Sequence, residues 1–169
     1  RSRVESIPGV GTINVNAATT ASVTNTSGTL AIDAGVALTG NVTNDGTVTL
    51  DGTLGDALVP GTGALTNTGT VNAAGGSAVT GTVNNNATGA LNVAGLVTFG
   101  GQIVNASGAT LDIASGGTLT STFGGDQIVN QAGGTFNTDG IANATVNNSG
   151  TITATGATFN RVVQNNAAG

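Results

Sequence analysis

The chain has 169 residues, of which 7% are charged and 2% aromatic, and it contains 29 glycines. Its formal net charge is −5 and its cations are Arg1, Arg3 and Arg161, so it has no basic patch that could neutralise a nucleic-acid backbone. His, Cys, Lys and Tyr are absent, which removes most nucleophiles, bases and metal ligands. Aliphatic residues still recur with period two, which favours an ordered β-rich chain over a disordered one.

The first ten residues do not fit the pattern that follows and are interpreted as a leading segment or linker. Residues 11–169 are predicted to form one β-solenoid domain. No apolar run approaches the roughly 18 residues that a membrane-spanning helix needs, so we expect no membrane insertion by this segment.

The repeat begins at Gly11. Residues 11–17, 28–34 and 46–52 each read glycine, threonine, aliphatic, any residue, aliphatic. Strand side chains alternate between faces, so the two aliphatics of each segment point inward. Aligning this strand through the chain gives two inward columns, the first of Ile13, Leu30, Val48, Val71, Leu91, Leu111, Phe136 and Ile152, and the second of Val15, Ile32, Leu50, Ala73, Val93, Ile113, Thr138 and Ala154.

An asparagine two positions after an aliphatic residue recurs in eight copies, at Asn25, Asn44, Asn67, Asn85, Asn105, Asn130, Asn148 and Asn165. Inward asparagines at a bend can hydrogen-bond to the asparagines of the turns above and below, so we predict a buried asparagine ladder. A glycine follows most of them after two to four residues, and we expect it to supply a positive φ at the bend.

A third short strand precedes the asparagine strand, as in 36–38, 78–80, 96–99 and 157–159. Three strands per turn and a period of 17 to 25 residues predict an all-β, right-handed parallel β-helix of about eight turns. Two turns are longer than the rest, around residues 52–63 and 115–126. Loops on a rigid scaffold often carry binding sites, but we interpret both as ordinary insertions.

Asp33 and Asp51 are the candidate acidic pair. They fall in one outward column of adjacent turns, about 5 Å apart by strand spacing, which suits two carboxyl groups acting on a glycosidic bond. The column continues with three alanines, and no aromatic residue, Arg or Lys accompanies the pair, so we interpret both as solvated surface acids. A weak calcium site there is the alternative; otherwise we expect no catalytic residue, metal or cofactor.

A threonine column on the outer surface raises ice binding as a further alternative. It reads Thr12, Thr29, Thr47, Thr70, Ala90, Thr110, Thr135 and Thr151. Ice binding needs two regular threonine columns on one face, and the second column is mixed, with Asn14, Ala31, Thr49, Asn72, Asn92, Asp112, Asn137 and Thr153. The threonines are better explained as residues that favour strands.

The recurring Val-x-Asn-x-(x)-Gly-Thr-Leu-x-Ile pattern resembles the passenger regions of bacterial autotransporters and the filamentous haemagglutinin-like adhesins. The likeness covers roughly Gly11 to Gly169 and concerns architecture. It implies an extracellular β-helical rod, secreted or on a bacterial cell surface. The chain contains no serine-protease motif, Arg-Gly-Asp motif or membrane barrel of those families, so no specific adhesin activity is implied.

The sequence therefore predicts a non-enzymatic, extracellular structural β-solenoid, such as a stalk, filament or cell-surface layer component. The chain enters partway through a turn and stops where the next strand would start, so we expect both ends to be uncapped. Either the chain is a segment of a longer rod, or copies associate head to tail along the axis as a homo-oligomer or filament. The alternatives are a β-helix that binds or cleaves polysaccharides, with host or bacterial surface glycans as partners, and an ice-binding solenoid.

Overall fold

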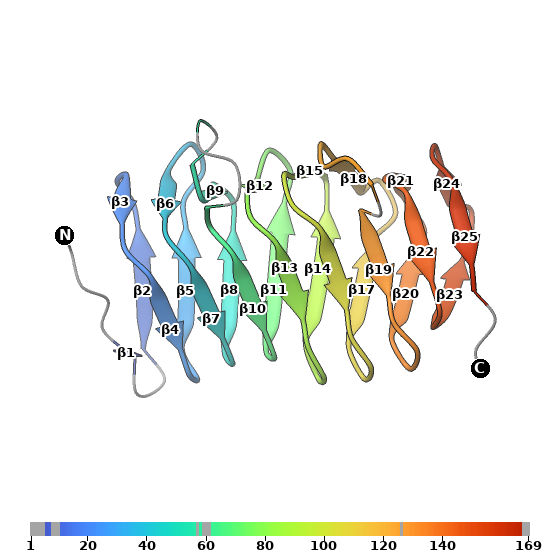
Figure 1. Cartoon of the computed structure of the whole chain (residues 1–169). Helices are drawn as coiled ribbons and strands as arrows, with labels where there is room; N and C mark the ends of the chain where they lie inside the picture. The colour runs from blue at the N-terminus through green and yellow to red at the C-terminus, as the bar shows by residue number, and fades with distance from the viewer. Residues whose placement is uncertain (1–5, 8–10, 57, 59–61, 126, 167–169) are drawn as a thin grey trace.

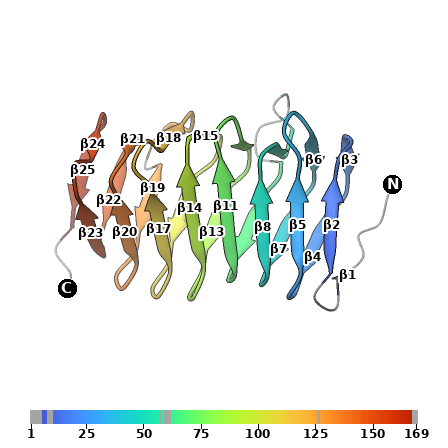
Figure 2. The same ribbon diagram turned by 180° about the vertical axis from the view of Figure 1, so that it is seen from behind.

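The computed structural model describes residues 6–7, 11–56, 58, 62–125 and 127–166, which form short strands without any helix (Figure 1). The strands stack side by side along one axis and are seen from the opposite side in Figure 2. They form three sheets in which all neighbouring strands are parallel. The predicted parallel β-solenoid with three strands per turn is confirmed.

We name the sheets A, B and C in the order in which the chain visits them in each turn. Sheet A contains nine strands, β1 (Ser6–Ile7), β4 (Val23–Asn25), β7 (Val42–Asn44), β10 (Leu65–Asn67), β13 (Val83–Asn85), β16 (Ile103–Asn105), β19 (Ile128–Asn130), β22 (Val146–Asn148) and β25 (Val163–Asn165). Sheet B contains eight, β2 (Thr12–Val15), β5 (Thr29–Ile32), β8 (Thr47–Leu50), β11 (Thr70–Ala74), β14 (Ala90–Ala94), β17 (Thr110–Ile113), β20 (Thr135–Thr138) and β23 (Thr151–Ala154). Sheet C contains eight, β3 (Thr19–Thr20), β6 (Ala37–Thr39), β9 (Thr53–Leu54), β12 (Ala78–Val79), β15 (Leu96–Phe99), β18 (Thr118–Ser121), β21 (Ile141–Asn143) and β24 (Thr158–Phe159).

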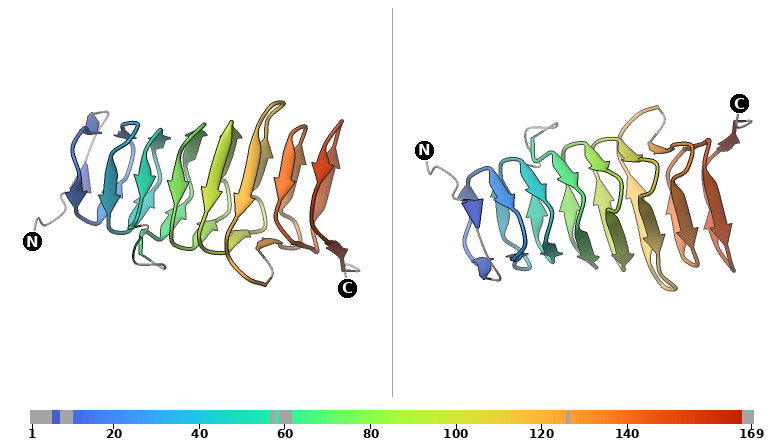
Figure 3. Two further views of the ribbon diagram at one scale, coloured as in Figure 1. Left: turned by 90° about the horizontal axis from the view of Figure 1, so that it is seen from above. Right: turned by 90° about the horizontal axis from the view of Figure 1, so that it is seen from below.

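The rod has about seven turns, one fewer than the sequence predicted, because the eight strands of sheet B are separated by seven steps. At about 4.8 Å per step the stack is about 34 Å long, and Figure 3 shows it from above and below. Strand β1 pairs with β4 through Ser6 and Thr24 and through Ile7 and Asn25. The first strand of sheet A therefore lies within the ten residues that we expected to precede the repeat.

The two predicted inward columns of sheet B are confirmed position by position in the strand register. Their side chains are buried through the middle of the rod and form one continuous core with the inward residues of sheets A and C. At the outermost strands Ile13 and Ile152 are only half-buried, and Ala154 is exposed. Phe136 packs edge-on against Phe159, with ring centroids 6.2 Å apart.

The predicted role of the glycines after the ladder asparagines is wrong. Gly46 and Gly69 do not have a positive φ. They lie so close to the preceding turn that a Cβ on Gly46 would be 2.4 Å from the carbonyl oxygen of Gly28, and one on Gly69 would be 2.1 Å from that of Gly46. In the turns after Asn85, Asn105 and Asn130 the bend comprises the four residues that follow the asparagine. Positive φ occurs at the third of these four residues, which are Thr88 (71°), Gly108 (79°) and Gly133 (80°).

Candidate functional site

The asparagine ladder is continuous, and all eight predicted members take part in it. The side-chain amide Nδ2 of each asparagine from Asn25 to Asn148 donates to Oδ1 of the asparagine in the next turn, over distances of 2.7 to 2.9 Å. Asn25, Asn44, Asn67, Asn85, Asn105 and Asn130 are completely buried, Asn148 is nearly so, and Asn165 is exposed.

The ladder amides from Asn25 to Asn148 also bond to backbone carbonyl groups at the bend. Asn85 Nδ2, for example, lies 3.1 Å from the carbonyl oxygen of Gly89 and 2.8 Å from that of Thr110, in addition to its bond to Asn105. The equivalent bonds are 3.4 Å from Asn105 to the carbonyl oxygen of Ala109 and 3.3 Å from Asn130 to that of Gly134, so an alanine at this position keeps the bond. The ladder is internal and its donors are occupied, so it is a structural element and not a ligand site.

Asp33 and Asp51 follow β5 and β8 directly, and the residues before them, Ile32 and Leu50, pair in the strand register. Their carboxyl oxygens form no hydrogen bond with the residues that the structure describes. Asp51 borders a shallow hollow of about 130 Å³ on sheet B, whose floor includes Ala74 and Ala94. Within the described part of the chain, no three Asp, Glu, His or Cys side chains gather as a metal site would require.

The outer face of sheet B has the predicted mixed composition. Its threonine column and the neighbouring column lie in register from β2 to β23. In the second column Asn92 Nδ2 donates to Asn72 Oδ1 over 2.9 Å at the exposed surface. The second column carries Thr49 and Thr153 among Asn, Asp and Ala, so the two columns do not form a regular double array of threonines.

The two long turns differ from the sequence prediction. The predicted loop 52–63 contains strand β9 (Thr53–Leu54), and the predicted loop 115–126 contains strand β18 (Thr118–Ser121). The connecting loops, which we call excursions, are therefore shorter and span residues 55–64 and 122–127, because each begins only where its strand of sheet C ends. Both connect sheet C to sheet A, from β9 to β10 and from β18 to β19.

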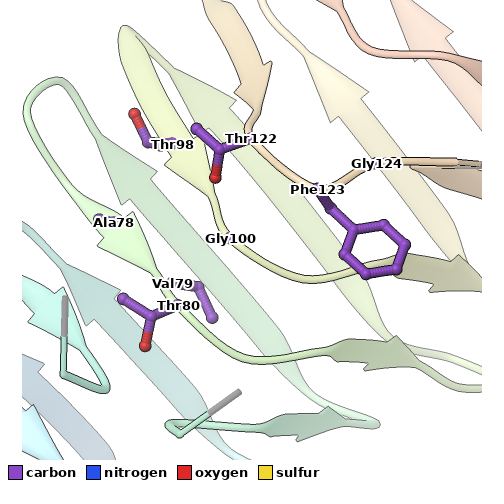
Figure 4. A pocket seen from close by; sticks show the side chains of 8 residues that line it. All are labelled: Ala78, Val79, Thr80, Thr98, Gly100, Thr122, Phe123 and Gly124. Carbon is purple, nitrogen blue, oxygen red and sulfur yellow. The ribbon is translucent and has the colours of Figure 1, made fainter. Parts of the chain in front are cut away.

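A groove of about 380 Å³ lies on the outer face of sheet C between these two excursions (Figure 4). Its lining residues come from three successive turns and are Ala78, Val79, Thr80, Thr98, Gly100, Thr122, Phe123 and Gly124. The strand register places Val79 opposite Phe99 and Phe99 opposite Ser121, so Gly100 lies between Thr80 and Thr122. The missing side chain at Gly100 hollows the surface there, and a Cβ would come within 2.8 Å of the Thr80 carbonyl oxygen.

The excursion after β18 is anchored by two buried polar side chains. Ser121 Oγ accepts a hydrogen bond from the backbone N–H of Phe123 over 3.2 Å. Gln127 Nε2 donates to the carbonyl oxygen of Phe123, and Gln127 Oε1 accepts from the N–H of Thr145 over 2.6 Å. Ser121 and Gln127 are both buried, whereas 40% of Phe123 is exposed. The backbone on both sides of this one exposed ring is thus held in place.

Ser121, Phe123 and Gln127 were missed by the sequence analysis. A signal for Ser121 was present, because it occupies an inward position of sheet C that Leu38, Leu54, Val79 and Phe99 fill in earlier turns. Phe123 is the one phenylalanine of the chain's four that the alternating strand pattern does not place inward.

No protein-family model matches this chain, and comparison with curated proteins and with solved structures found no similar protein. No helix among the described residues has the length and apolar character needed to cross a membrane.

Proposed function

We propose that this chain is a non-enzymatic, extracellular structural rod of a bacterial surface protein. The observation that carries the proposal is the unbroken asparagine ladder, whose seven links run from Asn25 on β4 to Asn165 on β25. A continuous buried hydrogen-bonded column ties each turn to both of its neighbours. Such a stack suits a spacer that must keep its length and straightness.

The surface chemistry supports a structural role rather than catalysis. The chain has no His, Cys, Lys or Tyr, and the outward columns of sheet B consist mainly of Thr, Asn and Ala. Such side chains offer neither an activated nucleophile nor a base of suitable pKa. The low content of charged and aromatic residues also leaves few of the Trp, Tyr and Arg anchors on which strong protein interfaces depend.

The extracellular location is tested by labelling intact cells that express the natural protein, with an antibody raised against residues 1–169. We expect labelling without permeabilisation and loss of the epitope after brief treatment of whole cells with proteinase K. A periplasmic or cytoplasmic protein serves as the control that survives this treatment. Labelling seen only after permeabilisation would overturn the proposal.

We further propose that copies of the isolated chain associate end to end along the solenoid axis. At the last strands Ile152, Phe159 and Val163 occupy core columns but are only half-buried. A further turn of the same kind would cover them, whether it comes from a second copy or from more of the same chain.

A further inference from the structure

We propose that the groove on sheet C is a binding site for an uncharged saccharide, with Phe123 as the surface on which a sugar ring stacks. The proposal does not depend on the rod having a structural role, because it rests on the local architecture of two neighbouring excursions. Its first support is the groove itself, which the two excursions flank and which is the larger of the two hollows described above.

The second support is the way in which Phe123 is presented. Phe99 and Phe136 are fully buried and Phe159 is half-buried against Phe136, so Phe123 has the most exposed ring of the four. Its backbone is fixed on both sides by buried side chains, Ser121 and Gln127. Ser121 occupies an inward position that earlier turns fill with apolar side chains, and Gln127 is a second buried polar side chain at the same bend. What these two residues hold in place is an exposed aromatic ring.

The third support is the chemistry of the lining. The eight lining residues include one phenyl ring and three threonine hydroxyl groups and no charged side chain. Thr80 Oγ1 already donates to the carbonyl oxygen of Thr62 over 2.8 Å, but the Thr98 hydroxyl group forms no hydrogen bond with the described residues, so it is free for a ligand. Thr98 pairs with Thr120 of the next turn, which extends the row of hydroxyl groups along the axis.

This combination matches a sugar better than a peptide or an ion. A pyranose ring presents a face of C–H bonds that packs on an aromatic ring and a rim of hydroxyl groups that hydrogen-bond with threonines. An ionic ligand would find no countercharge among the lining residues, and an apolar peptide would leave the Thr98 hydroxyl without a partner. The lining contains no carboxylate pair, so the site is proposed to bind saccharides without cleaving them.

The experiment uses the aromatic NMR spectrum of residues 1–169, which contains only four phenylalanine rings and no other aromatic residue. The probes are uncharged oligosaccharides of glucose, mannose and N-acetylglucosamine, with oligogalacturonate as an acidic comparison and N-acetylphenylalaninamide as an apolar one. We expect at least one uncharged oligosaccharide to shift the Phe123 ring signals, which are assigned from the Phe123→Leu spectrum. Phe123→Ala should weaken binding about tenfold, and Phe123→Trp should preserve it.

Leu96→Ala is the matched control, because Leu96 is another exposed apolar residue of sheet C, at the start of β15 and outside the groove lining. It should leave binding unchanged, whereas Thr98→Val should weaken it severalfold without unfolding the strand. The proposal is overturned if no saccharide shifts Phe123, if Phe123→Ala binds as tightly as the parent chain, or if N-acetylphenylalaninamide binds more tightly than every saccharide. None of these results would affect the cell-labelling test of the rod.

Discussion

Each ladder asparagine from Asn44 to Asn148 bonds in both directions along the rod, so the loss of one of these side chains disturbs two neighbours. Replacing Asn85 by Leu removes the acceptor of Asn67 Nδ2 and the donor to Asn105 Oδ1, and both groups are completely buried. We predict that Asn85→Leu lowers the free energy of unfolding by about 1–3 kcal/mol, measured by urea denaturation followed by circular dichroism.

Asn92→Ala is the control for this prediction. Asn92 also donates to another asparagine side chain over 2.9 Å, but this pair is at the surface, where water can replace the lost bond. Its unfolding free energy should change by less than about 0.5 kcal/mol. Equal losses in Asn85→Leu and Asn92→Ala would show that burial of the ladder contributes nothing.

Backbone conformation explains a second residue preference. Gly108 has a φ of 79°, and a Cβ there would meet no atom closer than 3.6 Å, so strain of the left-handed conformation is the main cost of a side chain. We predict that Gly108→Ala destabilises the chain by about 1 kcal/mol. Gly75→Ala, at a glycine with the same closest contact of 3.6 Å and no positive φ, should be neutral or slightly stabilising in the same denaturation experiment.

At the scale of the element, the excursion from β18 to β19 depends on Gln127. Replacement by Leu removes the acceptor of the Thr145 N–H and the donor to the Phe123 carbonyl oxygen. We predict that Gln127→Leu loosens this loop and speeds chymotrypsin cleavage after Phe123 several-fold, which mass spectrometry of the fragments measures. Gln131→Leu, at an exposed glutamine after β19, should leave the cleavage rate unchanged, and an unchanged rate in Gln127→Leu would contradict the anchoring role.

The strands could be predicted because every turn repeats the same constraint. A one-residue slip would turn Leu30 or Val48 outward and break the ladder at Asn44, so the aliphatic period and the asparagines fix the register together. The short strands β9 and β18 were hidden inside long turns, because two to four residues give too little alternation to be recognised.

The groove could not be predicted for a different reason. It depends on where Gly100 of one turn meets Thr122 of the next, and that neighbour relation follows from the register of β15 with β18, a strand that the sequence pattern did not reveal. The close contact between Gly69 and the carbonyl oxygen of Gly46 could not be predicted either. A close approach of two backbones requires a glycine, but the sequence does not show whether a glycine is there for this reason or for a positive φ.

At the scale of the whole molecule, the outermost strands determine how copies can meet. Val163 on β25 is half-buried in the column whose previous member, Val146, is completely buried. We predict that residues 1–169 form end-to-end oligomers, seen by sedimentation velocity and electron microscopy, and that Val163→Asp abolishes them by placing a charge in the contact. Val162→Asp adds the same charge to the neighbouring side chain, which is 67% exposed, and should still associate. A monomer at high concentration would defeat this prediction.

The ladder also makes the rod electrically directional. In all seven links the amide group of one turn donates to the carbonyl group of the following turn, so the side-chain dipoles are aligned from Asn25 to Asn165 and polarise one another. One end of the row offers a carbonyl oxygen and the other an amide hydrogen, as at the two ends of a helix. Two ladders can therefore continue each other only when unlike ends meet, because joining like ends would oppose donor to donor or acceptor to acceptor.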